Sequence, residues 1–70
     1  MILPDSIIVG QRIRQLRGKR SQTEVAKALG VTPMAISHYE NGDRMPTDKI
    51  KVEMARYFGC SVESIFFSAK

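Results

Sequence analysis

The chain has 70 residues, of which 43% are hydrophobic and 26% are charged, and its formal net charge is +4. This composition is typical of a globular protein and excludes a disordered or low-complexity chain. Because a chain of this length supports one small core, we expect residues 1–70 to form a single domain with no room for a second, ligand-sensing one.

The single cysteine, Cys60, excludes an internal disulfide and a cysteine-based metal site, so we expect no metal or other cofactor and a reducing compartment. The apolar start Met1–Leu3 is interrupted by Pro4 and Asp5. It has the pattern of neither a signal peptide nor a membrane span. We therefore expect a cytoplasmic protein that does not bind membranes. The positive charge permits a phosphate-binding face without proving one.

Apolar residues at helical spacing predict a first helix, in which Val9, Ile13 and Leu16 share one face. Asp5 or Ser6 can cap its start, and a glycine at position 18 can end it.

A second helix follows Ser21, which precedes Glu24 by the spacing of a capping box, and Gly30 ends it. A third helix begins with Thr32 as its cap and Pro33 at its first position. It ends at Asn41–Gly42, and residues 42–46 form a loop. The apolar faces of the two helices are Val25, Ala26 and Leu29, and then Ile36 and Tyr39.

Thr47 caps a fourth helix that Gly59 ends, and Ser61 caps a short fifth one. Their core-facing residues are Ile50, Met54, Ala55 and Phe58, followed by Val62, Ile65 and Phe66. Phe66 and Phe67 cannot both point inward, so one is expected in the core and the other is available to cover a dimer partner. Since no segment alternates with the period of a strand, the predicted fold is all-α, a compact bundle of five short helices.

The second and third helices have the spacing of a helix-turn-helix, with a short glycine-containing turn between them. The small Ala26 suits the close crossing of the two helices, and Gly30 suits a turn that needs positive φ. If Ile36 and Tyr39 point inward, a rotation of about 100° per residue defines the outer face. That face consists of Met34, His38 and Asn41, flanked by Pro33 and Ser37. It carries no acid, with Glu40 to one side, and its side chains could reach base edges in a major groove.

The stretch from Ile8 to Phe67 resembles the Cro/phage-repressor (XRE-type) helix-turn-helix family of DNA-binding domains. The residues that carry the resemblance, in order, are Arg12–Arg17, Ser21–Ala26, Leu29–Thr32, Ile36–Gly42, Pro46–Thr47 and Phe58–Val62. No one of these segments is decisive, but their order and spacing are specific. The resemblance implies a lambda-repressor-like fold whose third helix lies in the major groove of DNA.

The resemblance also implies roles for individual residues. Gln22 would bind a DNA phosphate and brace the recognition helix, and Asn41 and Arg44 would bind phosphates after that helix. Arg17 and Glu40 would form a structural ion pair. The base-reading positions are Thr32, Pro33, Met34, Ser37 and His38. Pro33 and Met34 stand where relatives commonly have long amide side chains. We therefore expect these two residues to recognise bases by shape or by apolar contact, for instance with a thymine methyl.

Three functions compete at this stage, and an enzyme is not among them, because no carboxylate pair, activated nucleophile or phosphate-binding glycine loop is present. The first is a transcriptional repressor that binds double-stranded DNA with a palindromic operator as a homodimer, without an evident small-molecule ligand. The second is the antitoxin of a toxin–antitoxin pair. The third is a protein-interaction module that does not bind DNA, for which acids on the recognition face would be expected.

Overall fold

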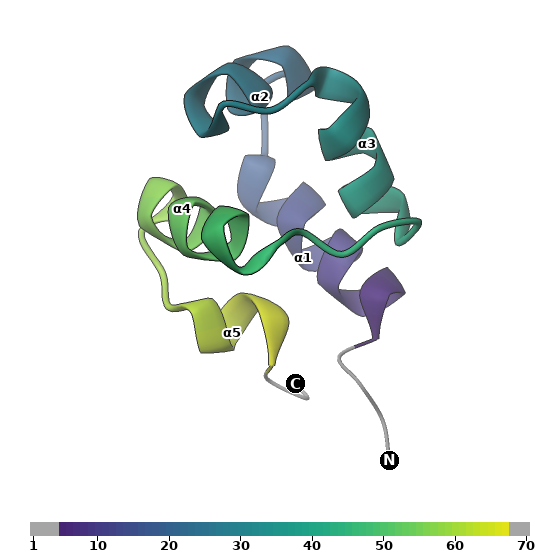
Figure 1. Ribbon diagram of the computed structural model, residues 1–70, viewed down its shortest axis with the longest axis vertical. Coiled ribbons are helices and arrows are strands. Elements are labelled where there is room, and N and C mark those ends of the chain that lie inside the picture. The colour runs from purple at the N-terminus through teal and green to yellow at the C-terminus, as the bar shows by residue number, and fades with distance from the viewer. Residues whose placement is uncertain (1–4, 68–70) are drawn as a thin grey trace.

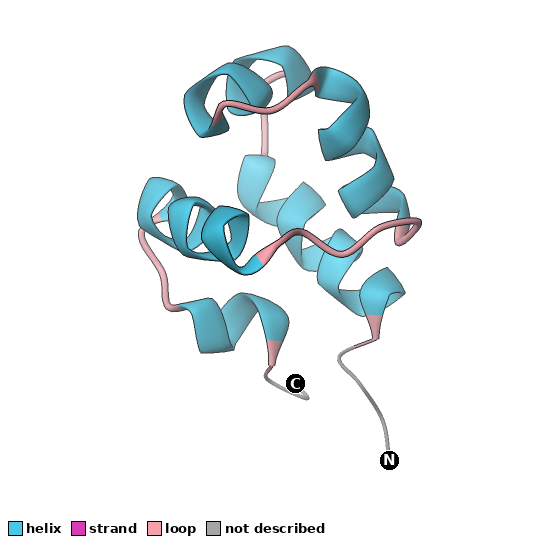
Figure 2. Cartoon of the chain, viewed as in Figure 1, coloured by secondary structure: helices cyan, strands magenta, loops and turns pink. Residues whose placement is uncertain are grey.

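Five α-helices follow one another in the computed structural model, which describes residues 5–67 (Figure 1). They are α1 (Ser6–Arg17), α2 (Gln22–Leu29), α3 (Pro33–Asn41), α4 (Asp48–Phe58) and α5 (Val62–Phe66). Between residues 5 and 67 there is no strand (Figure 2). The prediction of an all-α fold with five helices is confirmed.

Each helix begins at a side chain that accepts a hydrogen bond from a backbone N–H of the first turn. The cap of α1 is Asp5 rather than Ser6, and its carboxylate accepts from the N–H of Ile7 at 2.9 Å. Ser21 and Thr32 cap α2 and α3 in the same way, at 3.0 and 3.1 Å. These bonds satisfy donors that the helix itself leaves unpaired, so the local sequence fixes where each helix starts.

The helices are arranged around α1, with α2 and α3 at one end of the molecule and α5 at the other (Figure 1). α1 packs against α3 and α5, while α4 packs against α2 and α5. The molecule measures 34 × 23 × 22 Å. In the described part of the chain, none of the helices is long and apolar enough to cross a membrane.

One core runs through all five helices. It contains a fully buried side chain from each of them, namely Ile13, Val25, Ile36, Met54 and Phe66. By contrast, Phe67 is 56% exposed. The pair of phenylalanines therefore divides as predicted, with one ring in the core and the other on the surface.

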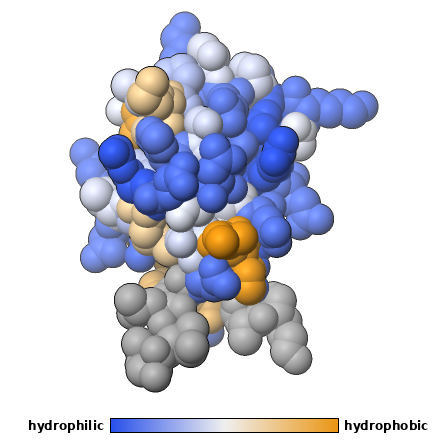
Figure 3. Space-filling model, turned by 90° about the vertical axis from the view of Figure 1, so that its right-hand side faces the viewer, coloured by the Kyte–Doolittle hydropathy of each residue, from blue (hydrophilic) through white to orange (hydrophobic). Residues whose placement is uncertain are grey.

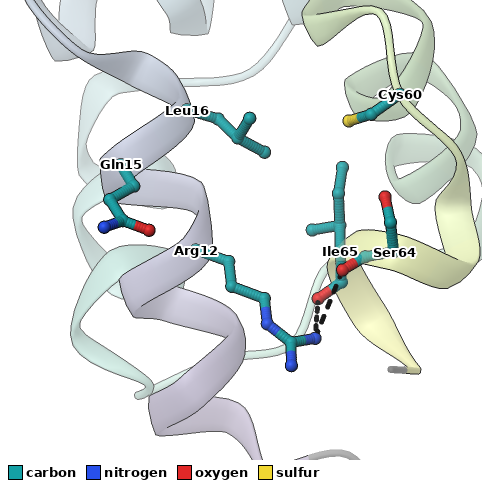
Figure 4. Close-up of a pocket in the computed structure, with 6 residues that line it drawn as sticks. All are labelled: Arg12, Gln15, Leu16, Cys60, Ser64 and Ile65. Carbon is teal, nitrogen blue, oxygen red and sulfur yellow. Dashed lines mark hydrogen bonds between the residues drawn. The ribbon is translucent and has the colours of Figure 1, made fainter. Parts of the chain in front are cut away.

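The guanidinium of Arg12 joins α1 to the end of α5. Its Nη1 donates to the carbonyl oxygens of Ile65 at 3.0 Å and Ser64 at 3.3 Å (Figure 4). The side chain spans an open cleft between the two helices that Leu16 and the half-buried Cys60 also line. Since the last carbonyls of a helix have no partner within it, Arg12 supplies one for the short α5.

Candidate nucleic-acid interface

The helix-turn-helix is built from α2, α3 and the three residues between them, Gly30–Thr32. Gly30 has φ +72°, in the left-handed region where a side chain is strained. The N–H of the next residue, Val31, donates to the carbonyl of Ala26 at 3.0 Å, which closes the end of α2. Ala26 is 1% exposed. The chain thus turns into α3 within three residues, and the side chain at the crossing is small.

One face of α3 packs on the protein and the other is open. Ile36, Tyr39 and Glu40 form the buried face. Pro33 and Asn41 are exposed, and Met34 is 70% exposed. Ser37 and the 37%-exposed side chain of His38 lie at the boundary. The five side chains for which an outward position was expected thus share a surface, and within α3 no acid lies on it, because Glu40 points inward.

The buried carboxylate of Glu40 accepts hydrogen bonds from two other helices. Arg17 of α1 donates to both carboxylate oxygens, through Nε to Oε2 and through Nη2 to Oε1 at 3.0 Å. Gln22, the first residue of α2, donates its amide to Oε1 at 3.1 Å. The side chain of Glu40 is only 3% exposed and that of Arg17 is 16% exposed. This network joins α1, α2 and α3 at one carboxylate.

The network also affects Arg17 itself. Its hydrogen bond to Glu40, and in a smaller degree the attraction between the two charges, outweighs desolvation and raises the pKa of Arg17 above its ordinary value. Arg17 also donates a hydrogen bond from Nη1 to the carbonyl of Arg20 at 2.7 Å, in the segment that links α1 to α2. Arg17 therefore holds both the Glu40 carboxylate and the link before α2.

The polar groups at the ends of α3 are partly engaged. Thr32 uses its hydroxyl oxygen as the cap acceptor, which leaves the hydroxyl hydrogen as a donor. Asn41 donates to Ser37 Oγ at 3.4 Å. His38 Nδ1 lies 3.7 Å from a carboxylate oxygen of Asp43. Thr32 and Asn41 remain exposed with these contacts in place, and the side chain of His38 is 37% exposed.

The expected phosphate-binding residues belong to three different segments of the chain. Gln22 is half-buried at the start of α2, and Arg44 is exposed in the loop after α3. Asn41 is exposed at the last position of α3. Along the chain, Gln22 precedes α3 and Arg44 follows it, with the base-reading candidates between them.

Asp43 is the residue near this surface that sequence reasoning missed. Its backbone N–H donates to the carbonyl of His38 at 2.9 Å, in the bonding pattern that ends a helix at a left-handed glycine, here Gly42. That pattern places the second residue after the helix beside the residue five positions earlier. An acid after a terminating Asn–Gly could therefore have been predicted to approach His38.

Residues 11–65 match the profile of the family described as Helix-turn-helix. The HTH-type transcriptional regulator DicA of Escherichia coli K12 is 34% identical over 64 residues, which cover 89% of this chain and 47% of DicA. The chain therefore spans about half the length of that relative. An uncharacterized HTH-type transcriptional regulator of Archaeoglobus fulgidus is 37% identical over 57 residues, covering 79% of this chain and 80% of the relative.

A similar solved structure is that of the P22 c2 repressor in complex with a synthetic operator. It superposes with a TM-score of 0.83 at 27% identity, over 86% of this chain and 94% of the repressor chain. The five helices therefore have a repressor-like arrangement.

Proposed function

Because the chain belongs to the helix-turn-helix family and has its DNA-binding, repressor-like fold, we propose that it is a transcriptional repressor. It would bind a palindromic operator as a homodimer. In this proposal residues 1–70 act as one DNA-binding domain in the cytoplasm, with α3 in the major groove. The observation that carries the proposal is that α3 places no acid on its outer face. Glu40, the only acid in α3, points inward and pairs with Arg17. Since α3 itself places no negative charge on this face, the face can approach DNA phosphates, and the nearby carboxylate of Asp43 lies 3.7 Å from His38.

The side chains of that face suit base edges. Met34 is the most exposed of them at 70%, and its thioether offers an apolar contact to a thymine methyl. His38 and Ser37 carry polar atoms that can exchange hydrogen bonds with base edges, while Thr32 and Pro33 approach at the start of the helix. The assignment makes these five residues the readers of sequence.

A second group would bind the DNA backbone. The amide of Gln22 keeps one N–H beyond its bond to Glu40, and helix N-termini such as that of α2 attract phosphate. Arg44 is exposed and permanently charged, and Asn41 can donate through its amide. Such contacts set the position of a domain on DNA without reading sequence.

The homodimer is supported by how little DNA one recognition helix contacts. One short helix contacts only a few base pairs, whereas two copies related by a two-fold axis read two half-sites about one helical turn apart. The repressor role is supported by the likeness to the P22 c2 repressor, whose structure contains a synthetic operator.

Selection of binding sites from random duplexes, read by sequencing, tests the proposal. We expect enrichment of a palindrome whose half-sites are centred about 10 base pairs apart. Failure to enrich any sequence would contradict specific DNA binding. Enrichment of an unrepeated motif would contradict the palindrome and retain DNA binding. A repressor further requires that the selected site, placed in a promoter, lowers transcription when the protein is present.

A further inference from the structure

The exposed carboxylate of Asp43 lies beside the imidazole ring of His38 in the recognition helix. Its Oδ2 atom is 3.7 Å from Nδ1 of the ring, and the side chains of Asp43 and His38 are 63% and 37% exposed. This distance is longer than a hydrogen bond but short enough for a direct electrostatic contact. Within residues 5–67, neither side chain has another ion-pair or hydrogen-bond partner. The carboxylate is therefore the polar group to which the ring responds.

The backbone at the end of α3 fixes this approach. Gly42 ends the helix with φ +79°, and the N–H of Asp43 donates to the carbonyl of His38 at 2.9 Å. The start of α1 holds the same turn from outside, because Ser6 Oγ donates to the Gly42 carbonyl at 3.0 Å and Ile7 packs closely against Gly42. A side chain on a fixed backbone has only a few rotamers. The position of Asp43 next to His38 is thus built into the turn.

A carboxylate beside Nδ1 influences which ring nitrogen carries the proton. A neutral imidazole has one N–H donor and one acceptor nitrogen, and a hydrogen-bond acceptor beside one nitrogen favours the proton there. An ionised carboxylate can only accept. Asp43 therefore favours the tautomer of His38 with the proton on Nδ1, which leaves Nε2 as an acceptor. Within the described part of the chain Nε2 has no hydrogen-bond partner, so it can accept from DNA.

We propose that Asp43 is a positioning residue that determines specificity: it holds His38 in the Nδ1–H tautomer, so that Nε2 accepts from the amino group of an adenine or a cytosine. The inference rests on the proposed function and adds the class of base that His38 reads. In the major groove adenine and cytosine present amino donors, whereas guanine and thymine present acceptors without such a donor. Either of the latter two bases would place its own lone pair against that of Nε2.

The surroundings of the pair suit this role. Figure 3 shows the side of the molecule on which α3 lies in Figure 1, and this side is mostly hydrophilic, with a compact hydrophobic patch close to the grey terminal residues. His38 follows the exposed Met34 by four residues, so the two lie on the same face of α3. An acid at this place repels the phosphates of every duplex alike. Its advantage is therefore expected in selectivity, since a wrong base is rejected by the groups that it leaves unpaired.

Nitrogen NMR of the full chain without DNA tests the tautomer, at about pH 8, where an imidazole is ordinarily neutral. His38 is the only histidine of the chain, so its ring nitrogens are observed without overlap. We expect the proton mainly on Nδ1 in the parent and in Asp43→Glu, which keeps the carboxylate. Asp43→Ala should move it towards Nε2. Glu63→Ala is the matched control and should change nothing, because Glu63 is an exposed acid of α5, at the opposite end of the molecule from α3 (Figure 1).

Selection of binding sites at the same pH, with the same variants and His38→Ala, tests the reading. We expect one position per half-site where the parent prefers adenine or cytosine by about fivefold or more and where His38→Ala loses the preference. Asp43→Ala should lower it there to about twofold or less, whereas Asp43→Glu and Glu63→Ala retain it. Because Asp43 acts through His38, adding Asp43→Ala to His38→Ala should change no base preference further. Thermal melting establishes that the variants fold.

Any of three results would overturn the inference. The first is a parent whose ring proton lies on Nε2, and the second is a guanine or thymine at the position that depends on His38. The third is an Asp43→Ala variant that binds every duplex more tightly, as Glu63→Ala does, with unchanged base preferences, because Asp43 would then be a repelling charge only. Since the NMR measurement contains no DNA, its failure leaves the proposed function standing. A parent that selects no sequence would contradict the proposed function, and the reading of a base with it, whatever the tautomer.

Discussion

Gly10 of α1 touches the backbone of Glu40 in α3, so closely that a Cβ atom on Gly10 would overlap the Glu40 carbonyl oxygen. The carbonyl oxygen of Tyr39 would be 2.5 Å away. The side chain of the same Glu40 is held by Arg17, two turns further along α1. Glu40 thus joins α3 to α1 through both its backbone and its side chain.

Gly10→Ala should therefore destabilise the fold by about 3 kcal/mol, because the added methyl meets backbone atoms that cannot rotate away. Urea unfolding followed by circular dichroism measures the change. Gln11→Ala, at the next and exposed position of the same helix, should stay within about 0.5 kcal/mol of the parent. Equal stability of Gly10→Ala and the parent would show that the two helices can separate without cost.

Arg17→Ala should destabilise the fold by about 3–5 kcal/mol, since it leaves the buried Glu40 carboxylate without its cation. The comparison variant is Arg14→Ala, which removes the same charge from an exposed site on α1. We expect Arg14→Ala to unfold at nearly the parent's denaturant concentration. A small loss in Arg17→Ala, equal to that in Arg14→Ala, would mean that the ion pair contributes nothing.

The raised pKa of Arg17 sets the sign of a pH effect. A cation whose pKa is higher in the folded state contributes stability that is complete below its unfolded pKa, and this contribution is lost only as pH rises through the folded value. The ordinary pKa of an arginine side chain already lies well above about pH 10. The difference in unfolding free energy between the parent and Arg17→Ala should therefore stay constant between about pH 7 and 10. A decline of that difference within this range would contradict the assignment.

The helix boundaries could be predicted because each depends on residues that are close in sequence. The cap at Ser21 and the left-handed Gly30, for example, each act within a few residues. Contacts between distant segments could not be predicted from spacing. The contact of Gly10 with Glu40 and the bond of Arg12 to α5 depend on how the helices pack, and nothing local in the sequence marks them.

The candidate site likewise has features that could be predicted from the sequence and features that could not. The outer face of α3 follows from helical periodicity and the positions of Ile36 and Tyr39, so it was predictable. The pairing of Arg17 with Glu40 joins positions 23 residues apart, and only the family resemblance pointed to it. The approach of Asp43 to His38 could have been predicted from the glycine that ends α3, because the turn at Gly42 brings the two residues together.

Met34→Ala and His38→Ala should each cost about 1–3 kcal/mol on the selected operator and leave binding to a scrambled duplex nearly unchanged. Neither side chain carries a permanent charge, so its contribution depends on the base that it meets. Competition titrations against both duplexes measure the ratio of affinities. If that ratio is the same for the variants and the parent, the base-reading face has been assigned to the wrong residues.

Gln22→Ala and Arg44→Ala should weaken binding to the operator and to the scrambled duplex by similar factors, because backbone contacts are independent of sequence. The same titrations serve here, and Val52→Ala is a suitable exposed control. A variant at either position that selectively lost the operator would act through the bases instead.

Salt should weaken binding steeply. If each copy neutralises three or four phosphates, a dimer neutralises about six to eight, and log K should fall with log salt at a slope of about −5 to −7. Titrations at several salt concentrations give the slope, and Arg44→Ala should reduce its magnitude by about two units per dimer. A slope near zero in the parent would exclude phosphate contacts.

The bond between Arg12 and α5 has a consequence for the order in which the chain acquires its structure during synthesis. Arg12 and the Ile65 carbonyl are 53 residues apart, and the fully buried Phe66 belongs to the last helix. The α2–α3 pair joins neighbouring segments and can form early, whereas α1 cannot complete its packing until α5 has left the ribosome. A nascent chain that stops before α5 would therefore present a recognition helix on an open core, and it would be a target for chaperones and proteases before it could act on DNA.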